Sequence, residues 1–141
     1  MTDFTGKNWM AVGETDDPNA VVASFEAVAA VAKGDPVYLS ADNKVSPATE
    51  AHDCIGVAVK SAASGEQCPV LTHGRVKVKA GDTITRGKAV FGADASKRVL
   101  ELTDQAVDEN GTAAYTVYYN RKLGTALETT TAADDLLFIQ V

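Results

Sequence analysis

Two stretches of the chain resemble each other, and this internal repeat limits the folds that the sequence can adopt. Residues 31–45 are VAKGDPVYLSADNKV, and residues 84–99 are ITRGKAVFGADASKRV. Each stretch has a β-branched residue, a basic residue and a glycine, followed by a short apolar run that ends on an aromatic side chain, a polar turn and a valine. Gly34 and Gly87 lie 53 residues apart. The repetition predicts two structurally similar units.

The similarity continues into the second part of each unit. IGVAV at residues 55–59 matches LGTAL at residues 123–127, at an offset of 68 residues. We therefore expect repeats over about 21–73 and 74–141. Because the offset grows from 53 to 68, the second repeat contains 15 additional residues, and we place this insert at about 103–120.

The repeat also settles an ambiguous segment near the start of the first unit. GRVKVKAG at 74–81 alternates apolar and basic residues, which is typical of a half-buried strand. The stretch VVASFEAVAAVA at 21–32 is less clear, because its alanines favour a helix whereas its alternation favours a strand. The offset of 53 places Phe25 opposite Val78, so we predict a strand over 21–28.

Turn-forming residues recur along the chain, and no long segment has a convincing helical period. This pattern predicts a compact all-β fold of many short strands. We expect the two units to fold against each other with pseudo-twofold symmetry and to share one core. Within the insert, Asn110 and Gly111 predict a hairpin turn, while residues 103–109 are also compatible with a short helix.

The length of 141 residues suits one domain. We expect a single all-β domain over 21–141, preceded by an extended N-terminal arm over 1–20. The arm carries Phe4, Trp9 and Met10, which is a large apolar surface for a loose tail. These side chains are therefore expected to dock on the same molecule or on a neighbour.

The charge of the chain argues against two classes of partner. Its formal net charge is −6 at pH 7, so it lacks the basic surface with which proteins grip nucleic acid or an anionic membrane. No stretch approaches the ~20 consecutive apolar residues of a membrane-spanning helix. The first residues also lack the apolar segment of a signal peptide, so we expect synthesis in a cytoplasm.

Few residues invite a catalytic interpretation. His52, beside Asp53, and His73 are the two histidines, and both are interpreted as solvated loop residues rather than acid–base groups. Cys54 and Cys68 are expected ~13 Å apart along a hairpin, which is too far for a disulfide, so we predict two free thiols. The sequence contains no activated nucleophile, paired carboxylates or zinc-ligand spacing, so we predict no enzymatic activity, no cofactor and no metal site.

A basic row offers a candidate interaction surface. Arg75, Lys77 and Lys79 alternate along one predicted strand and would share one face. The row could bind acidic groups of a partner, or it could be a solvated strand face that resists edge-to-edge aggregation. The full set of candidate interface residues is Phe4, Trp9, Met10, Arg75, Lys77 and Lys79.

Residues 55–91, IGVAVKSAASGEQCPVLTHGRVKVKAGDTITRGKAVF, carry a resemblance to a known family. The G-[VI]-A hairpin, the SAASGE turn, the PVL…GRV strand and the AGDTITRGKAV strand–turn–strand resemble the small capsid decoration, or cement, proteins of tailed bacterial and archaeal viruses. The same features are similar to the β-clip fold of the lambda-type head decoration protein. The resemblance spans roughly 20–141, and the 15-residue insert departs from it.

The resemblance implies a structural role on the virion. Such proteins bind the major capsid protein as homotrimers at threefold positions on the outer surface of the head, partly through an N-terminal arm, and stabilise the shell against packaged DNA. Apolar anchors such as Phe4 and Trp9 suit such contacts.

Two other functions stay open from the sequence. One is a β-clip ligand-binding or enzyme-associated module of the SAF-like kind, which would need a polar cleft formed by His73, Arg75 and Asp82. The other is a structural component of a viral tail or fibre.

Overall fold

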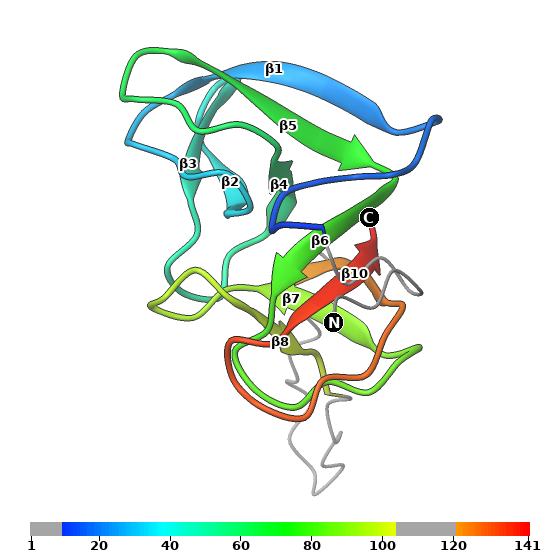
Figure 1. Cartoon of the computed structure of the whole chain (residues 1–141). Coiled ribbons are helices and arrows are strands. Elements are labelled where there is room, and N and C mark those ends of the chain that lie inside the picture. Colours follow the sequence, from blue (N-terminus) through cyan, green and yellow to red (C-terminus); the bar gives the residue numbers. More distant parts are fainter. Residues whose placement is uncertain (1–9, 104–120) are drawn as a thin grey trace, which may run out of the picture.

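The computed structural model describes residues 10–103 and 121–141, and Figure 1 shows its strands arranged in two sheets. No α-helix occurs in these two ranges, so the predicted all-β class is confirmed. The helix and the hairpin turn expected in the insert fall within residues 104–120, outside the described part of the chain. The strands are β1 (Val21–Ala27), β2 (Pro36–Ala41), β3 (Lys44–Pro47), β4 (Cys54–Ala58), β5 (Gln67–His73), β6 (Arg75–Lys79), β7 (Ala89–Gly92), β8 (Val99–Glu101), β9 (Lys122–Ala126) and β10 (Leu136–Gln140).

The first five strands form a closed barrel in the order β1-β3-β2-β4-β5. β1 confirms the strand predicted over 21–28, and it runs antiparallel to β5. The barrel closes where β1 meets β3 in parallel, through the pairs Glu26–Lys44 and Ala27–Val45. This closure covers only the last two residues of β1.

The second sheet repeats this strand order. Its order is β6-β10-β9-β7-β8. When β6 to β10 are matched in turn to β1 to β5, this is the order β1-β5-β4-β2-β3, which is the closed barrel followed from β1 in the direction of β5. The sheet is open between β8 and β6, but an isolated parallel bridge joins Ala80 to Val99 there. That bridge corresponds to the Ala27–Val45 pair of the barrel.

Isolated β-bridges repeat as well. In the barrel, an isolated antiparallel bridge joins Val31 to Ala62, and its counterpart in the second sheet joins Ile84 to Thr130. The two partners in each bridge are offset by 53 and 68 residues from one half to the other. The sequence repeat therefore corresponds to equivalent backbone contacts, although the outer boundaries of the two units, about 21–73 and 74–141, stay a prediction.

The two units share a core, as expected, but the buried apolar side chains form two clusters rather than one. The smaller cluster lies in the barrel and includes Val37, Val45 and Val70. The larger cluster fills the second sheet and extends to the outside of the barrel, where Val57 and Leu71 belong to it. Side chains along a strand point alternately to the inside and the outside of the barrel. Those that point outward join the two halves, while those that point inward form the barrel's own core.

The described part of the N-terminal arm docks on β6 of the same molecule. The backbone N–H of Gly13 donates to the carbonyl of Lys77 at 2.7 Å, and the N–H of Lys77 donates to the carbonyl of Glu14 at 2.9 Å. Gly13 has a φ of +80°, so two arm residues oppose one residue of β6 in a G1 bulge. The side chain of Thr15 then donates to the carbonyl of Arg75, which shows that the arm runs antiparallel to β6.

Candidate functional site

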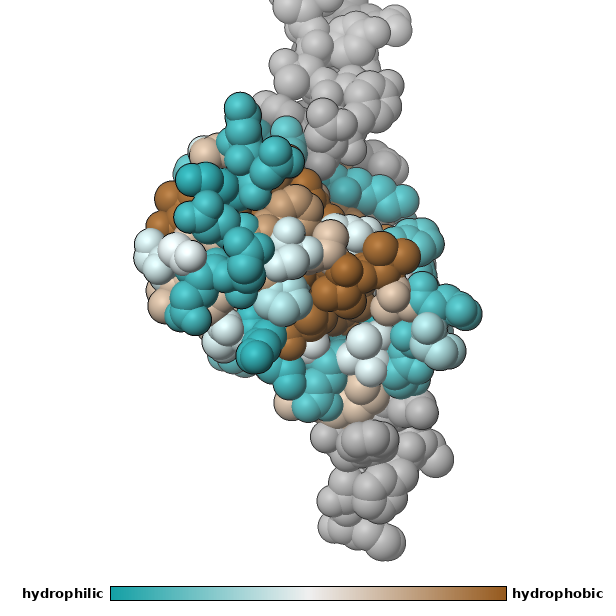
Figure 2. Space-filling model, turned by 90° about the horizontal axis from the view of Figure 1, so that it is seen from above, coloured by the Kyte–Doolittle hydropathy of each residue, from teal (hydrophilic) through white to brown (hydrophobic). Residues whose placement is uncertain are grey.

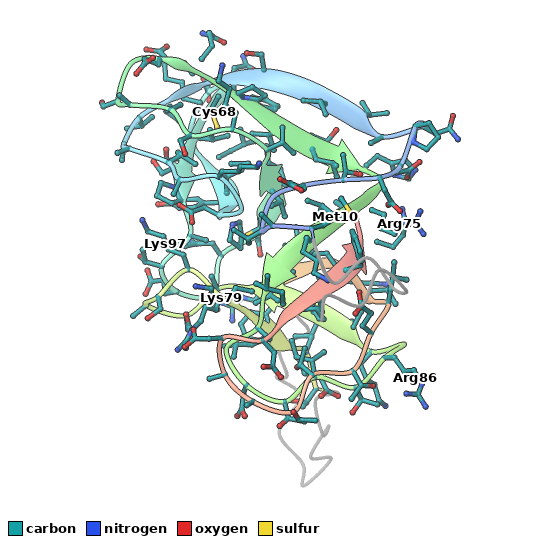
Figure 3. The ribbon with its side chains drawn as sticks, viewed as in Figure 1. Met10, Cys68, Arg75, Lys79, Arg86 and Lys97 are labelled. Atoms are coloured by element: carbon teal, nitrogen blue, oxygen red, sulfur yellow. The ribbon has the colours of Figure 1, made fainter. Side chains whose placement is uncertain are left out.

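Of the candidate interface residues in the arm, Met10 alone falls within the described part of the chain. Phe4 and Trp9 lie outside the described residues. Met10 is only 5% exposed and lies beside β6, as Figure 3 shows. Met10 therefore packs within its own chain, and an interface through this side chain would require the arm to be displaced.

The basic row on β6 is not a uniform exposed face, because Lys77 is buried. Lys77 pairs directly with Phe138 of β10, and its side chain is 1% exposed. The ammonium Nζ lies 4.6 Å from the centre of the Phe138 ring and 3.7 Å from Oε1 of Glu128. A cation over an aromatic face and beside a carboxylate can be held in such a place. Lys77 thus has its partners within the molecule.

Arg75 and Lys79, at the two ends of β6, stay accessible (Figure 3). The Arg75 side chain is 42% exposed, and its Nε donates to Oδ1 of Asp16 in the arm at 2.9 Å. Its guanidinium carbon lies 5.9 Å from the centre of the Phe138 ring. Lys79 is exposed and pairs directly with Leu136, which is 37% exposed. The row therefore presents two separated cations, with the buried pair of Lys77 and Phe138 between them.

Exposed aliphatic side chains mark surfaces that the sequence pattern did not identify. Val21 and Val22 at the start of β1 are 52% and 48% exposed, and a register shift between them places a bulge there. Figure 2 looks down on this side of the molecule and shows a group of apolar side chains surrounded by polar ones. The sequence signal for this exposed surface is the pair of adjacent valines at the start of β1. In a regular strand neighbouring side chains point to opposite faces, so at least one of the two valines faces away from the inside of the barrel.

A shallow pocket lies over β2 and β4. Its lining residues are Tyr38, Leu39, His52, Asp53, Cys54 and Ile55. The His52 ring stacks on Tyr38 with the ring centres 3.8 Å apart, and its Nε2 lies 3.6 Å from Oε1 of Glu50. His52 is therefore held against an aromatic side chain, and this stacking fixes the ring at the edge of the pocket.

The thiol in this pocket is poorly suited to nucleophilic chemistry. Burial, with a smaller contribution from the charge of Asp53, raises the pKa of Cys54 to about 12, although the hydrogen bond to the Gly92 carbonyl opposes this shift. Burial also raises the pKa of Cys68. Nucleophilic cysteines need a lowered pKa, so both side chains act as small apolar groups at neutral pH. Both thiols are free, as predicted.

The polar cleft required for a ligand-binding module does not form from its expected residues. Arg75 begins β6, whereas Asp82 follows the opposite end of that strand. The carboxylate of Asp82 accepts a hydrogen bond from the N–H of Thr83, its own neighbour in the turn. Within residues 10–103 and 121–141, no three His, Cys, Asp or Glu side chains gather into a group that could hold a metal ion. The described segments also contain no helix long and apolar enough to cross a membrane.

The fold is similar to that of the N base of head fibre gp8.5 of bacteriophage phi29. The comparison has a TM-score of 0.57 and 18% sequence identity, and it covers 86% of this chain and 93% of the phi29 chain. At this identity the similarity shows a shared fold alone. No curated protein matches the sequence.

A family model described as phage cement protein matches residues 48–141. The matched segment begins just before β4 and includes the whole second sheet. It covers two-thirds of the 141 residues and contains residues 55–91, whose motifs carry the resemblance quoted above. The chain therefore belongs to the phage cement protein family.

Proposed function

We propose that this chain decorates and stabilises a viral head without enzymatic activity. In this proposal it binds the major capsid protein as a homotrimer at threefold positions on the outer surface of the shell, after synthesis in the host cytoplasm. The match of the cement family to residues 48–141 carries the proposal. Two units of β-clip type would provide the scaffold.

The surface at the exposed end of β6 suits a contact with the shell. Lys79 and Leu136 lie directly opposite each other, so one cation and one aliphatic side chain share a face. Interfaces commonly combine apolar contact with charge pairing at the rim. Phe4 and Trp9 would add apolar anchors, because aromatic residues contribute strongly to interface energies. Arg75 is already paired with Asp16, so its contribution would need that pair to be shared or exchanged.

Threefold symmetry explains how modest contacts could give firm attachment. Once one subunit of a trimer is bound, the other two are held near their sites, so their effective concentration is high. Each contact can then be weak while the trimer as a whole stays on the shell.

The test measures the occupancy of expanded heads of the cognate virus by co-sedimentation. The variant Lys79→Glu/Leu136→Glu should lower the apparent affinity by about tenfold or more, since it reverses the charge and removes the apolar contact. The matched control Lys60→Glu/Leu39→Glu makes the same changes on the barrel and should bind like the parent chain.

The solution mass complements the binding measurement. Light scattering should give three times the 14.7 kDa chain mass, in solution or when the protein is released from heads. If the parent chain does not bind heads, the decoration role is wrong. Long assemblies without head binding would instead favour a tail or fibre component.

A further inference from the structure

The outer edge of β1 lacks a neighbouring strand over most of its length. β1 pairs with β5 from Val21 to Glu26, but β3 reaches only Glu26 and Ala27 on the other side. In Figure 1, β1 arches over the top of the barrel, and no described strand lies beyond it. Unpaired edges of this kind recruit extended segments of other chains.

The backbone of Ser24 points outward at the middle of this edge. Ser24 lies opposite Pro69, which has no N–H to donate. The carbonyl of Pro69 accepts from the N–H of Val59 at 3.1 Å, on the β4 side. Ser24 and Pro69 therefore form a pair without mutual hydrogen bonds, and in such a pair both backbone groups of Ser24 face away from β5. Among the described residues, no backbone hydrogen bond reaches Ser24 from the outer side.

The second unit shows what fills an edge of this kind. The repeat offset of 53 places Lys77 of β6 at the position of Ser24, and the pair Lys77–Phe138 corresponds to Ser24–Pro69. Both backbone groups of Lys77 bond to Gly13 and Glu14 of the N-terminal arm. An extended segment of this chain thus covers the edge of β6, while the equivalent edge of β1 is uncovered by any described residue.

We propose that the edge of β1 receives residues 1–9 from a second copy of this chain. This inference rests on the homotrimer of the proposed function. Nine residues precede Met10, and nine extended residues span about 30 Å, which is enough for a connection and a strand of about five residues. The strand would pair antiparallel with β1 at Ser24, as the arm does with β6 at Lys77.

Side chains beside this edge suit the same occupant. Val21 and Val22 are about half exposed, and they would gain apolar partners from Phe4 or Trp9 of the incoming arm. Each copy would give one arm and receive one. Such a head-to-tail interface closes a ring when the rotation between copies is 120°, which is the symmetry of a trimer.

A proline substitution at Ser24 tests the pairing in the full-length chain. Ser24→Pro removes the outward N–H but no bond to β5, and proline is tolerated at a strand edge that faces solvent. Ser24→Ala is the matched control, because both variants lose the side-chain hydrogen bond to Gln67 and only one loses the backbone donor. A second variant, Phe4→Pro/Thr5→Pro, disrupts the incoming segment instead. Circular dichroism and thermal unfolding check that each variant is folded.

Sedimentation velocity and amide hydrogen exchange provide the measurements. The parent chain and Ser24→Ala should associate as trimers with a protected backbone amide at position 24, while Ser24→Pro and the arm variant should weaken association by about tenfold or more. Unchanged trimers in both proline variants would overturn the inference, as would a monomer whose Ser24 amide is protected by its own arm. A parent chain that is monomeric with a rapidly exchanging Ser24 amide would overturn it too.

Head binding separates this inference from the proposed function. If trimers persist in the proline variants and still occupy heads, the decoration role stands and the arm exchange is wrong. If the parent chain forms arm-linked trimers that do not bind heads, the arm exchange stands and the decoration role is wrong.

Discussion

Gly34 and Gly87 occupy equivalent positions in the two halves of the chain. Both have positive φ angles, +93° and +86°. The N–H of Gly34 donates to the carbonyl of Ala58 at 2.7 Å, and the N–H of Gly87 donates to that of Ala126 at the same distance. The two glycines differ in their surroundings, because an added Cβ would be 2.5 Å from Val12 at Gly34 but would meet no atom within 4 Å at Gly87.

This difference predicts unequal costs for the same substitution. Gly87→Ala should lower the free energy of unfolding by about 1 kcal/mol, because only the left-handed backbone is strained. Gly34→Ala should cost roughly 2–3 kcal/mol, since the new methyl group also collides with Val12. Urea denaturation measures both values. Adding Val12→Ala should recover part of the loss at Gly34 and none at Gly87; equal costs at the two glycines would contradict this account.

The repeat made much of the fold predictable from sequence. The offset between Gly34 and Gly87 identified β1 as a strand despite its alanines, because the matching segment, β6, alternates clearly. The hairpin of β4 and β5 was also predicted, but its register, with Val57 opposite Leu71, is known only from the structure. Register depends on the whole network of strand contacts, which local composition does not specify.

The candidate site was harder to predict, because side-chain exposure depends on distant segments. Lys77 alternates correctly with Arg75 and Lys79, yet Phe138 and Glu128 enclose its ammonium group from 61 and 51 residues farther along the chain. Met10 is likewise buried by tertiary contacts. The half-exposed edge of β1 follows from the short reach of β3, and no local motif encodes that reach.

The buried cation of Lys77 predicts an asymmetry between two neutralising substitutions. Lys77→Met keeps the volume and removes the charge, so the free energy of unfolding should change by less than about 1 kcal/mol. Glu128→Gln still offers an oxygen to the N–H of Phe138, but it leaves the ammonium without its carboxylate and should cost about 1–2 kcal/mol. The double variant should resemble Lys77→Met in urea denaturation. A Lys77→Met variant that is the less stable of the two would contradict this interpretation.

The raised pKa of Cys54 predicts a loss of stability in alkali. The folded state favours the neutral thiol, with a pKa of about 12, while the unfolded thiol titrates near its ordinary value of 9.0. The neutral thiol's contribution to the free energy of unfolding is complete below pH 9. It declines as the pH rises towards 12, by about 1.4 kcal/mol per pH unit. Urea unfolding at pH 8 and pH 10 should therefore show a steeper decline for the parent chain than for Cys54→Ala. Parallel declines would show that another group is responsible.

Thr130 provides a further test of the equivalence between the two halves. In the barrel, the N–H of Val31 donates to the backbone carbonyl of Ala62, whereas in the second sheet the N–H of Ile84 donates to the hydroxyl of Thr130 at 2.9 Å. That hydroxyl also donates to the carbonyl of Asp82 at 3.1 Å.

Because Thr130 is 2% exposed and Ile84 is fully buried, water cannot replace these bonds without local opening. Thr130→Val keeps the shape but leaves a buried N–H without an acceptor, so it should cost about 1–3 kcal/mol. Thr130→Ser keeps the hydroxyl and should cost less than about 1 kcal/mol. Thermal unfolding with hydrogen exchange at the Ile84 amide measures both effects, and the Ile84 amide should exchange faster only in the valine variant. Equal stability of the two variants would mean that the N–H of Ile84 moves to the backbone carbonyl of residue 130, as the N–H of Val31 does in the barrel.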